Sequence, residues 1–282
     1  MEYFIYNGKI TEGKTLILGP ANRGMRYGDG LFETMKFGKA GLVLADEHFA
    51  RLWKGMQLLR FDIPSRLTAP DLSEQVKQLA LKNKLTAARI RLTVIRGDGG
   101  IYDAINNIPN YIIEAIPLPE SAGAFNTNGL QLCIFRDAVK ATDLFSNIKH
   151  NNMLPYFMGG LFAKSAKCND AIILNSRGNI CETTIANIFI IKNGIIITPL
   201  LTEGCIAGVM RNWLIEKIRS LGFTVIETAI TTGELFNANE IFLSNSIMNI
   251  RWVAAVEDHR FTSTLTQKIA HELAMEYREI MG

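Results

Sequence analysis

The chain has 282 residues, of which 48% are hydrophobic and 20% charged, so it is long enough for one large globular domain or two smaller ones. Its net charge of +3 comes from 30 basic and 27 acidic side chains spread along the chain, which argues against nucleic acid or an anionic membrane as a partner. No stretch reaches the ~18 uninterrupted apolar residues of a membrane span, and the amino terminus lacks a signal-peptide pattern. We expect a cytoplasmic protein that binds small molecules, without membrane or nucleic-acid partners.

The cysteines give no sign of a metal site. None of the four forms a C-x-x-C pair, and all lie beyond residue 130: Cys133, Cys168, Cys181 and Cys205. Reduced, packed thiols are therefore expected rather than a disulfide framework or a bound metal.

The first part of the chain alternates strand and helix patterns. Apolar residues at helical spacing predict two helices, at residues 47–60 and 71–84, with Asp46 as a candidate cap of the first. Short alternating or β-branched runs predict strands at residues 3–6, 31–37, 42–44, 88–96 and 111–116. This mixture indicates an α+β domain over residues 1–117.

A proline-punctuated segment, residues 118–125, is the expected linker to a second domain over residues 126–282. Strands are predicted there at residues 130–135, 171–174, 188–191, 195–199, 223–226 and 240–244. Helices are predicted from the segment after Lys149 to about residue 167, and at residues 208–221 and 267–280. Asn193 and Gly194 predict a hairpin turn.

Two charged residues occur in apolar surroundings. Lys149 precedes an apolar run, where an ammonium group either reaches water, lies beside a carboxylate, or serves as a nucleophilic amine. Glu182 lies in a β-branched run over residues 180–190, where a carboxylate is expected to be buried with a partner. The simplest interpretation is a salt bridge from Glu182 to Lys149 or Arg177.

Pyridoxal phosphate offers a more specific interpretation. This cofactor needs a lysine for its aldehyde, a carboxylate at its ring nitrogen, and a cation with backbone N–H groups for its phosphate. Lys149, Glu182, Arg51 and the turn that precedes the helix at residues 208–210 are the candidates. The residue types alone leave both interpretations open.

Several motifs occur together in the order and spacing of a known family. They include NRGMRYGDGLFET at residues 22–34, and further groups at residues 47–52, 148–154, 182–189, 198–199 and 208–211. With these motifs the chain resembles the fold-type IV pyridoxal-phosphate enzymes, also called class IV aminotransferases. That family includes branched-chain and D-amino-acid aminotransferases and aminodeoxychorismate lyase. The resemblance implies a two-domain fold of class α+β or α/β, with a smaller N-terminal α+β domain and a larger C-terminal domain that has a mixed, barrel-like sheet and flanking helices.

The resemblance also assigns roles to residues. Lys149 matches the catalytic Schiff-base lysine and Glu182 the acid at the pyridine nitrogen. The phosphate-binding positions of the family correspond to Arg51, Val209, Met210, Asn245 and Ser246. Met210 departs from the family, which often has a threonine there, so backbone N–H groups would have to serve. A further expectation is a homodimer.

The substrate residues are less sharply defined. Tyr27, Thr34 and Arg96 are candidate substrate contacts, although Tyr27 precedes a possible turn, Thr34 could be a cross-strand residue, and Arg96 could pair with Asp98. For Arg51, an ion pair with Glu47 four residues earlier is an additional possibility.

The family resemblance leaves the reaction undecided between two chemistries. Amino-acid transamination with a 2-oxo acid acceptor is the first choice, and 4-amino-4-deoxychorismate lysis, which releases 4-aminobenzoate and pyruvate, is the alternative. The lyases usually carry Arg-Gly-Tyr where this chain has Ile101-Tyr102-Asp103, and branched-chain aminotransferases often carry tyrosine where this chain has Leu154. A non-catalytic dimeric relic of the fold is the third hypothesis.

Overall fold

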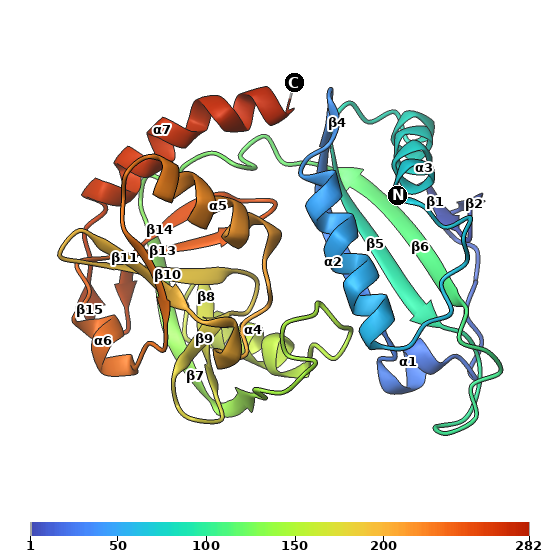
Figure 1. Ribbon diagram of the computed structural model, residues 1–282, viewed down its shortest axis with the longest axis horizontal. Coiled ribbons are helices and arrows are strands. Elements are labelled where there is room, and N and C mark those ends of the chain that lie inside the picture. Colours follow the sequence, from blue (N-terminus) through green and yellow to red (C-terminus); the bar gives the residue numbers. More distant parts are fainter. Residues whose placement is uncertain (1, 282) are drawn as a thin grey trace. The chain divides into compact units, whose positions relative to one another are not determined.

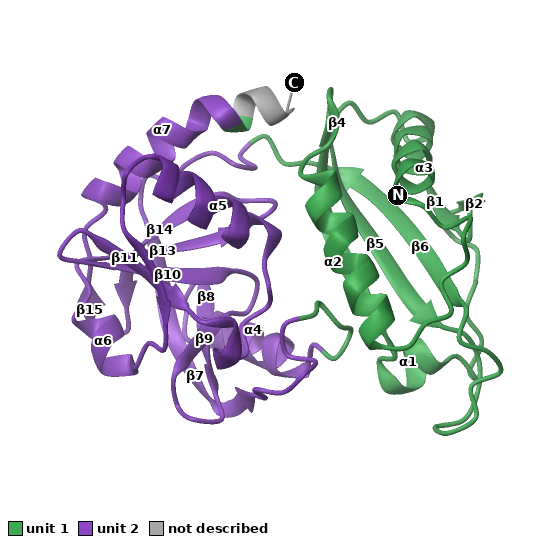
Figure 2. Ribbon diagram, viewed as in Figure 1, with its two compact units in different colours: residues 1–120, 148–152, 277–282 green, residues 121–147, 153–276 purple. Residues whose placement is uncertain are grey.

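A computed structural model describes residues 2–281, except for the side chains of residues 278–281 (Figure 1). The chain divides into two compact units (Figure 2). Unit 1 comprises Met1–Glu120, Ile148–Asn152 and Tyr277–Gly282, and unit 2 comprises Ser121–Asn147 and Met153–Glu276. The chain therefore does not divide by a single cut in the expected linker, because the short segment that contains Lys149 belongs to unit 1.

Unit 1 is an antiparallel sheet with helices. Within the described residues its strands follow the order β2-β1-β6-β5-β3-β4. The strands are β1 Tyr3–Tyr6, β2 Lys9–Glu12, β3 Gly30–Gly38, β4 Gly41–Leu42, β5 Ala88–Arg96 and β6 Pro109–Pro117. The helices are α1 Arg23–Tyr27, α2 Ala45–Leu58 and α3 Ala69–Lys82. The α+β class expected from the sequence is confirmed.

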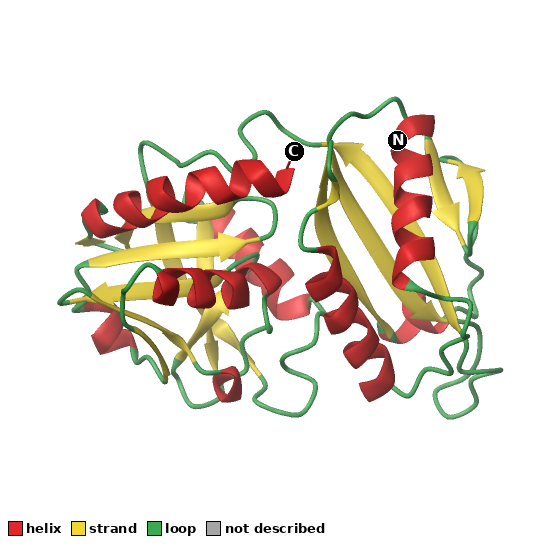
Figure 3. Cartoon of the chain, turned by 45° about the horizontal axis from the view of Figure 1, so that its top comes forward, coloured by secondary structure: helices red, strands yellow, loops and turns green. Residues whose placement is uncertain are grey.

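Helices α2 and α3 cover one face of this sheet and form the core of unit 1 with it (Figure 3). Side chains alternate between the faces of a strand, so Leu31 and Met35 of β3 face the helices, as do Ile90 and Leu92 of β5. The two predicted helices are confirmed. Asp46, however, does not cap α2. The helix begins after Leu44, which makes no side-chain capping bond, and Asp46 lies in the first turn.

The Lys149 segment lies along the edge of β3. The N–H of Phe32 donates to the carbonyl of Lys149 at 2.9 Å, and the N–H of Asn151 donates to the carbonyl of Gly30 at 2.9 Å. A Cβ atom at Gly30 would lie 2.2 Å from the carbonyl oxygen of Val94 and 2.7 Å from Nδ2 of Asn151. Glycine at position 30 is therefore what lets these chains approach so closely.

Unit 2 contains a mixed sheet. Among the described residues its main path runs β12-β11-β10-β13-β14-β7-β8-β9, and β15 pairs with β14. The strands are β7 Leu130–Lys140, β8 Asp170–Asn175, β9 Ile180–Thr183, β10 Asn187–Lys192, β11 Ile195–Pro199, β12 Val225–Thr228, β13 Glu240–Asn245, β14 Asn249–Val256 and β15 His259–Arg260. The sheet curls into the half-barrel that the resemblance implied, because β9 returns to contact β10.

The helices of unit 2 are α4 Leu154–Ser165, α5 Val209–Ser220, α6 Thr232–Phe236 and the part of α7 Thr264–Met281 that ends at Glu276, with a 3₁₀ turn at Leu201–Glu203. The buried carboxylate of Glu240 accepts hydrogen bonds from the N–H groups of Leu265 and Thr266, which fixes the start of α7 to β13. The hairpin predicted at Asn193 and Gly194 is confirmed, with φ of 51° and 79° at these residues. No helix within residues 2–281 is long and apolar enough to cross a membrane.

Candidate active site

Lys149 and Phe32 share one face of the unit 1 sheet. This is the face opposite α2 and α3, because Lys149 lies beside Phe32 and strand residues alternate. The lysine Nζ lies 4.6 Å from the centroid of the Phe32 ring, and the guanidinium carbon of Arg91 lies 3.8 Å from the same centroid. The candidate catalytic amine and a guanidinium group thus converge on one buried aromatic ring.

The predicted substrate residues Tyr27 and Thr34 lie near this face. Thr34 is directly opposite Arg91 on the neighbouring strand. Tyr27 ends α1, and this helix packs near Ile95, two pleats beyond Arg91 on the same face. Their substrate roles stay predictions.

Arg96 points the other way. It has the opposite parity from Arg91 along β5, and its guanidinium binds Asp29 Oδ2 at 3.0 Å, Asn107 Oδ1 at 2.7 Å and the carbonyl of Leu59 at 2.5 Å. These contacts hold the loop after β5 against the end of α2. A substrate carboxylate could bind Arg96 only by replacing these contacts, so the substrate role suggested for Arg96 stays a prediction.

Arg51 is held by a buried acid on β3. Its Nε and Nη2 bind the two oxygens of Glu33 at 2.8 and 2.5 Å, and Nδ1 of His48 lies 2.7 Å from Glu33 Oε2. Glu33 is thus a partner of Arg51 that the sequence did not suggest, and the additional ion pair with Glu47 stays a prediction. Such a bidentate pair fixes the plane of the guanidinium group. The expected phosphate-binding role of Arg51 stays a prediction, and Glu33 would orient it.

The same cluster predicts acid sensitivity. Burial alone would raise the pKa of Glu33, but the charge of Arg51 and the hydrogen bonds from His48 and Arg51 hold it at about 2, against 4.5 in the unfolded chain. Because the folded pKa is the lower one, this stabilisation is complete above pH 4.5 and is lost as the pH falls towards 2. The shift corresponds to about 3 kcal/mol.

We expect urea unfolding at pH 3 to 6 to show a steeper loss of stability on acidification for the wild type than for Glu33→Gln. The exposed Glu216→Gln variant should keep the wild-type slope, and equal slopes for wild type and Glu33→Gln would contradict the assignment.

Both carboxylate oxygens of Glu182, in unit 2, accept hydrogen bonds from buried donors. Its Oε1 accepts from Lys140 Nζ and from the Tyr156 hydroxyl, both at 2.6 Å. Its Oε2 accepts from Asn187 Nδ2 at 3.3 Å and from the N–H of Ile206 at 3.1 Å. Glu182 is only 3% exposed, as predicted. Its cationic partner, however, is Lys140 and neither Lys149 nor Arg177, since Arg177 pairs with Glu203.

The hydroxyl of Tyr156 remains a donor in this cluster. Burial, followed by the charge and hydrogen bond of Glu182, raises its pKa well above the ordinary value. A protonated tyrosine, a lysine and a backbone N–H therefore all stabilise a negative charge on Glu182. This donor set fits an acid that must stay ionised opposite a protonated pyridine nitrogen.

The start of α5 is a candidate anion site. Its N-cap, Gly208, provides no side-chain cap, and a Cβ atom there would lie 2.0 Å from Oδ1 of Asn187. The first turn begins with the predicted phosphate-binding residues Val209 and Met210. Both are buried, and Met210 has no hydroxyl, so the backbone N–H groups of a helix start are the suitable donors.

Asn245 and Ser246 form the turn after β13. The Asn245 side chain accepts from the N–H groups of Ile247 and Met248 and donates to the carbonyl of Ile185 at 3.1 Å. Asn245 thus shapes the turn and joins it to the turn after β9. Their cofactor contacts stay predictions.

Sequence reasoning missed Glu33, Arg91, Lys140 and Tyr156. Strand alternation could have drawn attention to two of them. Glu33 is on the same side of β3 as its core residues, and Arg91 is on the side of β5 opposite its core residues. Lys140 lies 42 residues from Glu182, and no sequence period relates the two.

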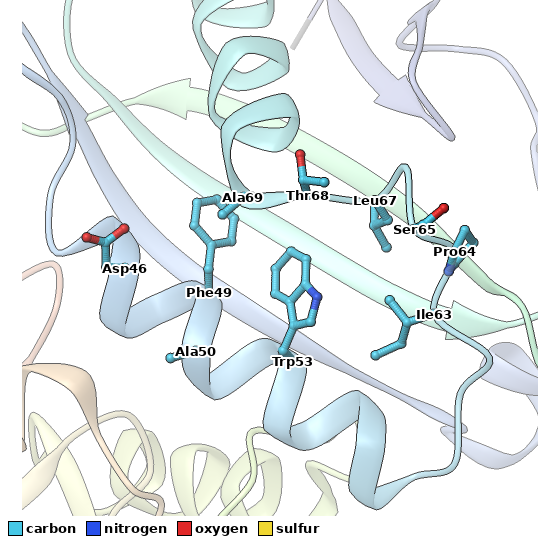
Figure 4. Close-up of a pocket in the computed structure, with 10 residues that line it drawn as sticks. All are labelled: Asp46, Phe49, Ala50, Trp53, Ile63, Pro64, Ser65, Leu67, Thr68 and Ala69. Carbon is cyan, nitrogen blue, oxygen red and sulfur yellow. The ribbon is translucent and has the colours of Figure 1, made fainter.

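A pocket of about 550 Å³ lies among α2, the start of α3 and the segment between them (Figure 4). Phe49, Trp53 and Leu67 contribute to its wall, together with Asp46, and none of the predicted site residues lines it. Within the described part of the chain, no group of His, Cys, Asp and Glu side chains is arranged to hold a metal ion.

Comparison with known proteins defines the class. Residues 30–256 match the family model of class IV amino-transferases, so the chain belongs to this family, whose members are pyridoxal-phosphate enzymes. A putative branched-chain-amino-acid aminotransferase of Methanocaldococcus jannaschii is 28% identical over 97% of this chain and 94% of its own length. An aminodeoxychorismate lyase of Vibrio harveyi is 28% identical over 83% of this chain and 86% of its own. The structure of a branched-chain aminotransferase from Thermoproteus uzoniensis superposes with a TM-score of 0.88 at 24% identity, covering 99% of this chain and 95% of its own, and supports the fold alone.

Proposed function

We propose that this protein is a pyridoxal-phosphate-dependent aminotransferase that moves the amino group of a small amino acid to a 2-oxo acid. The observation that carries the proposal is the convergence of Lys149 and Arg91 on Phe32. An α-amino acid has its carboxylate one bond away from the reacting carbon. An amine and a guanidinium group on one sheet face match that pair of functional groups.

The cofactor, when bound, supplies an electron sink for the electrons left by deprotonation of the substrate α-carbon. Lys149 would hold it covalently and, once released, would carry the proton from the α-carbon on its own Nζ. Glu182, which accepts hydrogen bonds from Lys140 and Tyr156, would also accept one from the ring nitrogen. Arg51, the start of α5 at Val209 and Met210, and the turn at Asn245 and Ser246 would receive the phosphate.

Arg91 is suited to the substrate carboxylate. Burial, opposed by the charge of Glu114, lowers the pKa of its guanidinium from the usual 12.5, and a guanidinium remains charged nonetheless. Its one hydrogen bond within the described residues runs from Nε to Thr93 at 3.3 Å. The Nη groups are thus available for a bidentate carboxylate.

Amino-group transfer and lysis can be separated by product analysis. We expect the purified holoenzyme, given amino acids and 2-oxoglutarate, to form glutamate and the matching 2-oxo acid. Aminodeoxychorismate without an acceptor should yield little pyruvate. The reverse result would establish the lyase alternative, which the similarity to the Vibrio harveyi enzyme supports. A protein with no cofactor absorbance at ~420 nm would instead be the non-catalytic relic.

The protein is also proposed to form a homodimer, supported by an apolar face on α4. Leu154, Phe157, Met158 and Leu161 follow helical spacing, and their side chains are between 43% and 68% exposed. Monomers rarely expose such a patch, and a second copy of the same helix can cover it by two-fold symmetry.

This surface gives a direct prediction. Phe157→Glu places a charge on the apolar face and is expected to weaken the dimer at least about tenfold, measured by sedimentation equilibrium. Lys77→Glu alters the charge of an exposed polar position on α3, away from α4, and should leave the dimer intact. A Phe157→Glu protein that dimerises as tightly as the wild type would exclude α4 from the interface.

A further inference from the structure

Two of the cysteines lie side by side in unit 2, although they are distant in the sequence. Cys133 is on β7, and Cys168 is in the segment between α4 and β8. Cys168 packs against the buried cluster that contains Cys133, and a hydrogen bond joins the two thiol groups. Both thiols are free in this structure. The two sulfur atoms are therefore close enough to react with each other after a small adjustment of their side chains.

Backbone hydrogen bonds hold the two residues on the same face of the sheet. The N–H of Cys168 donates to the carbonyl of Ala163 at 2.8 Å and thereby closes the end of α4. The N–H of Asn169 donates to the carbonyl of Gln131 at 2.7 Å, which fixes the following residue beside β7. Cys133 faces α4 as well, because it packs in one cluster with Ala163. The contact between the thiols is thus a property of the folded unit.

The two thiols differ in how easily a reagent can reach them. Cys133 is 6% exposed, whereas Cys168 is only half-buried. Burial, followed by the hydrogen bond with Cys168, raises the pKa of Cys133 to about 12, so this thiol keeps its proton at neutral pH. An external reagent therefore meets Cys168 first.

We propose that Cys133 and Cys168 are a modification site at which a small-molecule disulfide, such as oxidised glutathione, generates a reversible disulfide bond inside unit 2. The Cys168 thiolate attacks one sulfur of the reagent, forms a mixed disulfide and releases the first reagent thiol. Cys133 then loses its proton, attacks Sγ of Cys168 and releases the second reagent thiol. Two protein thiols are oxidised while one reagent disulfide is reduced to two thiols, so electrons and protons balance. The site needs neither cofactor nor substrate, and it is independent of the proposed function.

The test treats the purified holoenzyme with oxidised glutathione and follows it by mass spectrometry. The wild type is expected to lose the mass of two hydrogen atoms, and its digest without reductant should contain a peptide pair linked through Cys133 and Cys168. Cys133→Ser should stop at the mixed disulfide and gain the mass of one glutathionyl group, and Cys168→Ser should keep its mass. Cys181 and Cys205 are buried and serve as internal controls that remain thiols. Dithiothreitol should reverse every change.

A wild type that stays unmodified or ends as the mixed disulfide would overturn the inference. A disulfide between two copies of the chain, or a linked pair that contains Cys181 or Cys205, would do the same.

Urea unfolding provides a second readout. The oxidised wild type is expected to unfold at a higher urea concentration than the reduced protein, because a cross-link between distant residues restricts the unfolded chain. Cys168→Ser should show no such shift after the same treatment. A lower midpoint for the oxidised wild type would mean that the bond forms only by distorting the fold, which contradicts the proposal. The absorbance at ~420 nm tests the cofactor separately, so its loss would reject the proposed enzyme and leave the thiol site standing.

Discussion

Lys149→Ala is expected to abolish the cofactor absorbance near ~420 nm and to lower kcat by about 10³-fold or more, because the variant lacks the amine that binds the aldehyde and carries the proton. The measurement is an absorbance spectrum of protein reconstituted with pyridoxal phosphate, together with a single-turnover assay of an amino acid. Added methylamine should restore part of the proton transfer, since a small free amine can replace the missing base.

The matched control is Lys164→Ala on α4, an exposed lysine close in sequence. It should retain both the absorbance band and the activity. If Lys149→Ala keeps the band while another lysine variant loses it, the covalent residue has been assigned to the wrong position.

Glu182→Gln is expected to have the second largest effect. The substitution preserves the shape of the side chain but removes the charge that would keep the ring nitrogen protonated, so kcat should fall by about 10²-fold. It also leaves Lys140, which is 6% exposed, without its carboxylate partner. Breaking a buried ion pair from one side costs about 3 to 5 kcal/mol, which urea unfolding at pH 7 would measure.

A double variant separates the two consequences. Lys140→Met in the Glu182→Gln background removes the unpaired buried ammonium, and it is expected to recover most of the lost stability because an apolar side chain of similar length fills the space. Activity should remain low. If activity returns together with stability, then Glu182 acts only by holding the fold around Tyr156 and Asn187.

The helices of unit 1 illustrate what periodicity can predict. α2 and α3 follow directly from apolar residues at helical spacing, because a helix in a small domain must bury one stripe of its surface. The ends are less determined. Asp46 is a good capping residue by type, yet α2 begins before it, with Leu44 in a left-handed conformation. The chain enters the helix from the β4 turn, and that geometry depends on the sheet.

In the candidate site, too, the sequence identified residues but not the contacts that they make. Lys149 and Glu182 could be singled out because a charged group in an apolar run is costly unless it is partnered or used. Their surroundings could not be predicted. Tyr156 reaches Glu182 only because α4 packs on the β7 and β8 side of the curled sheet, and Arg91 rather than Arg96 shares a face with Lys149 because strand parity acts through the pairing with β3.

The amino-acid sequence by itself determined the α+β class, the main helices, the family motifs and the two residues on which the proposed chemistry depends. These are properties of local periodicity and of residue type, and neither needs a partner elsewhere in the chain. Only the tertiary structure decided that Lys140 pairs with Glu182, that Glu33 holds Arg51, and that Arg91 rather than Arg96 shares a face with Lys149. Such pairings join residues distant in the chain, and they are fixed by strand register and sheet curvature, which no short stretch of sequence encodes.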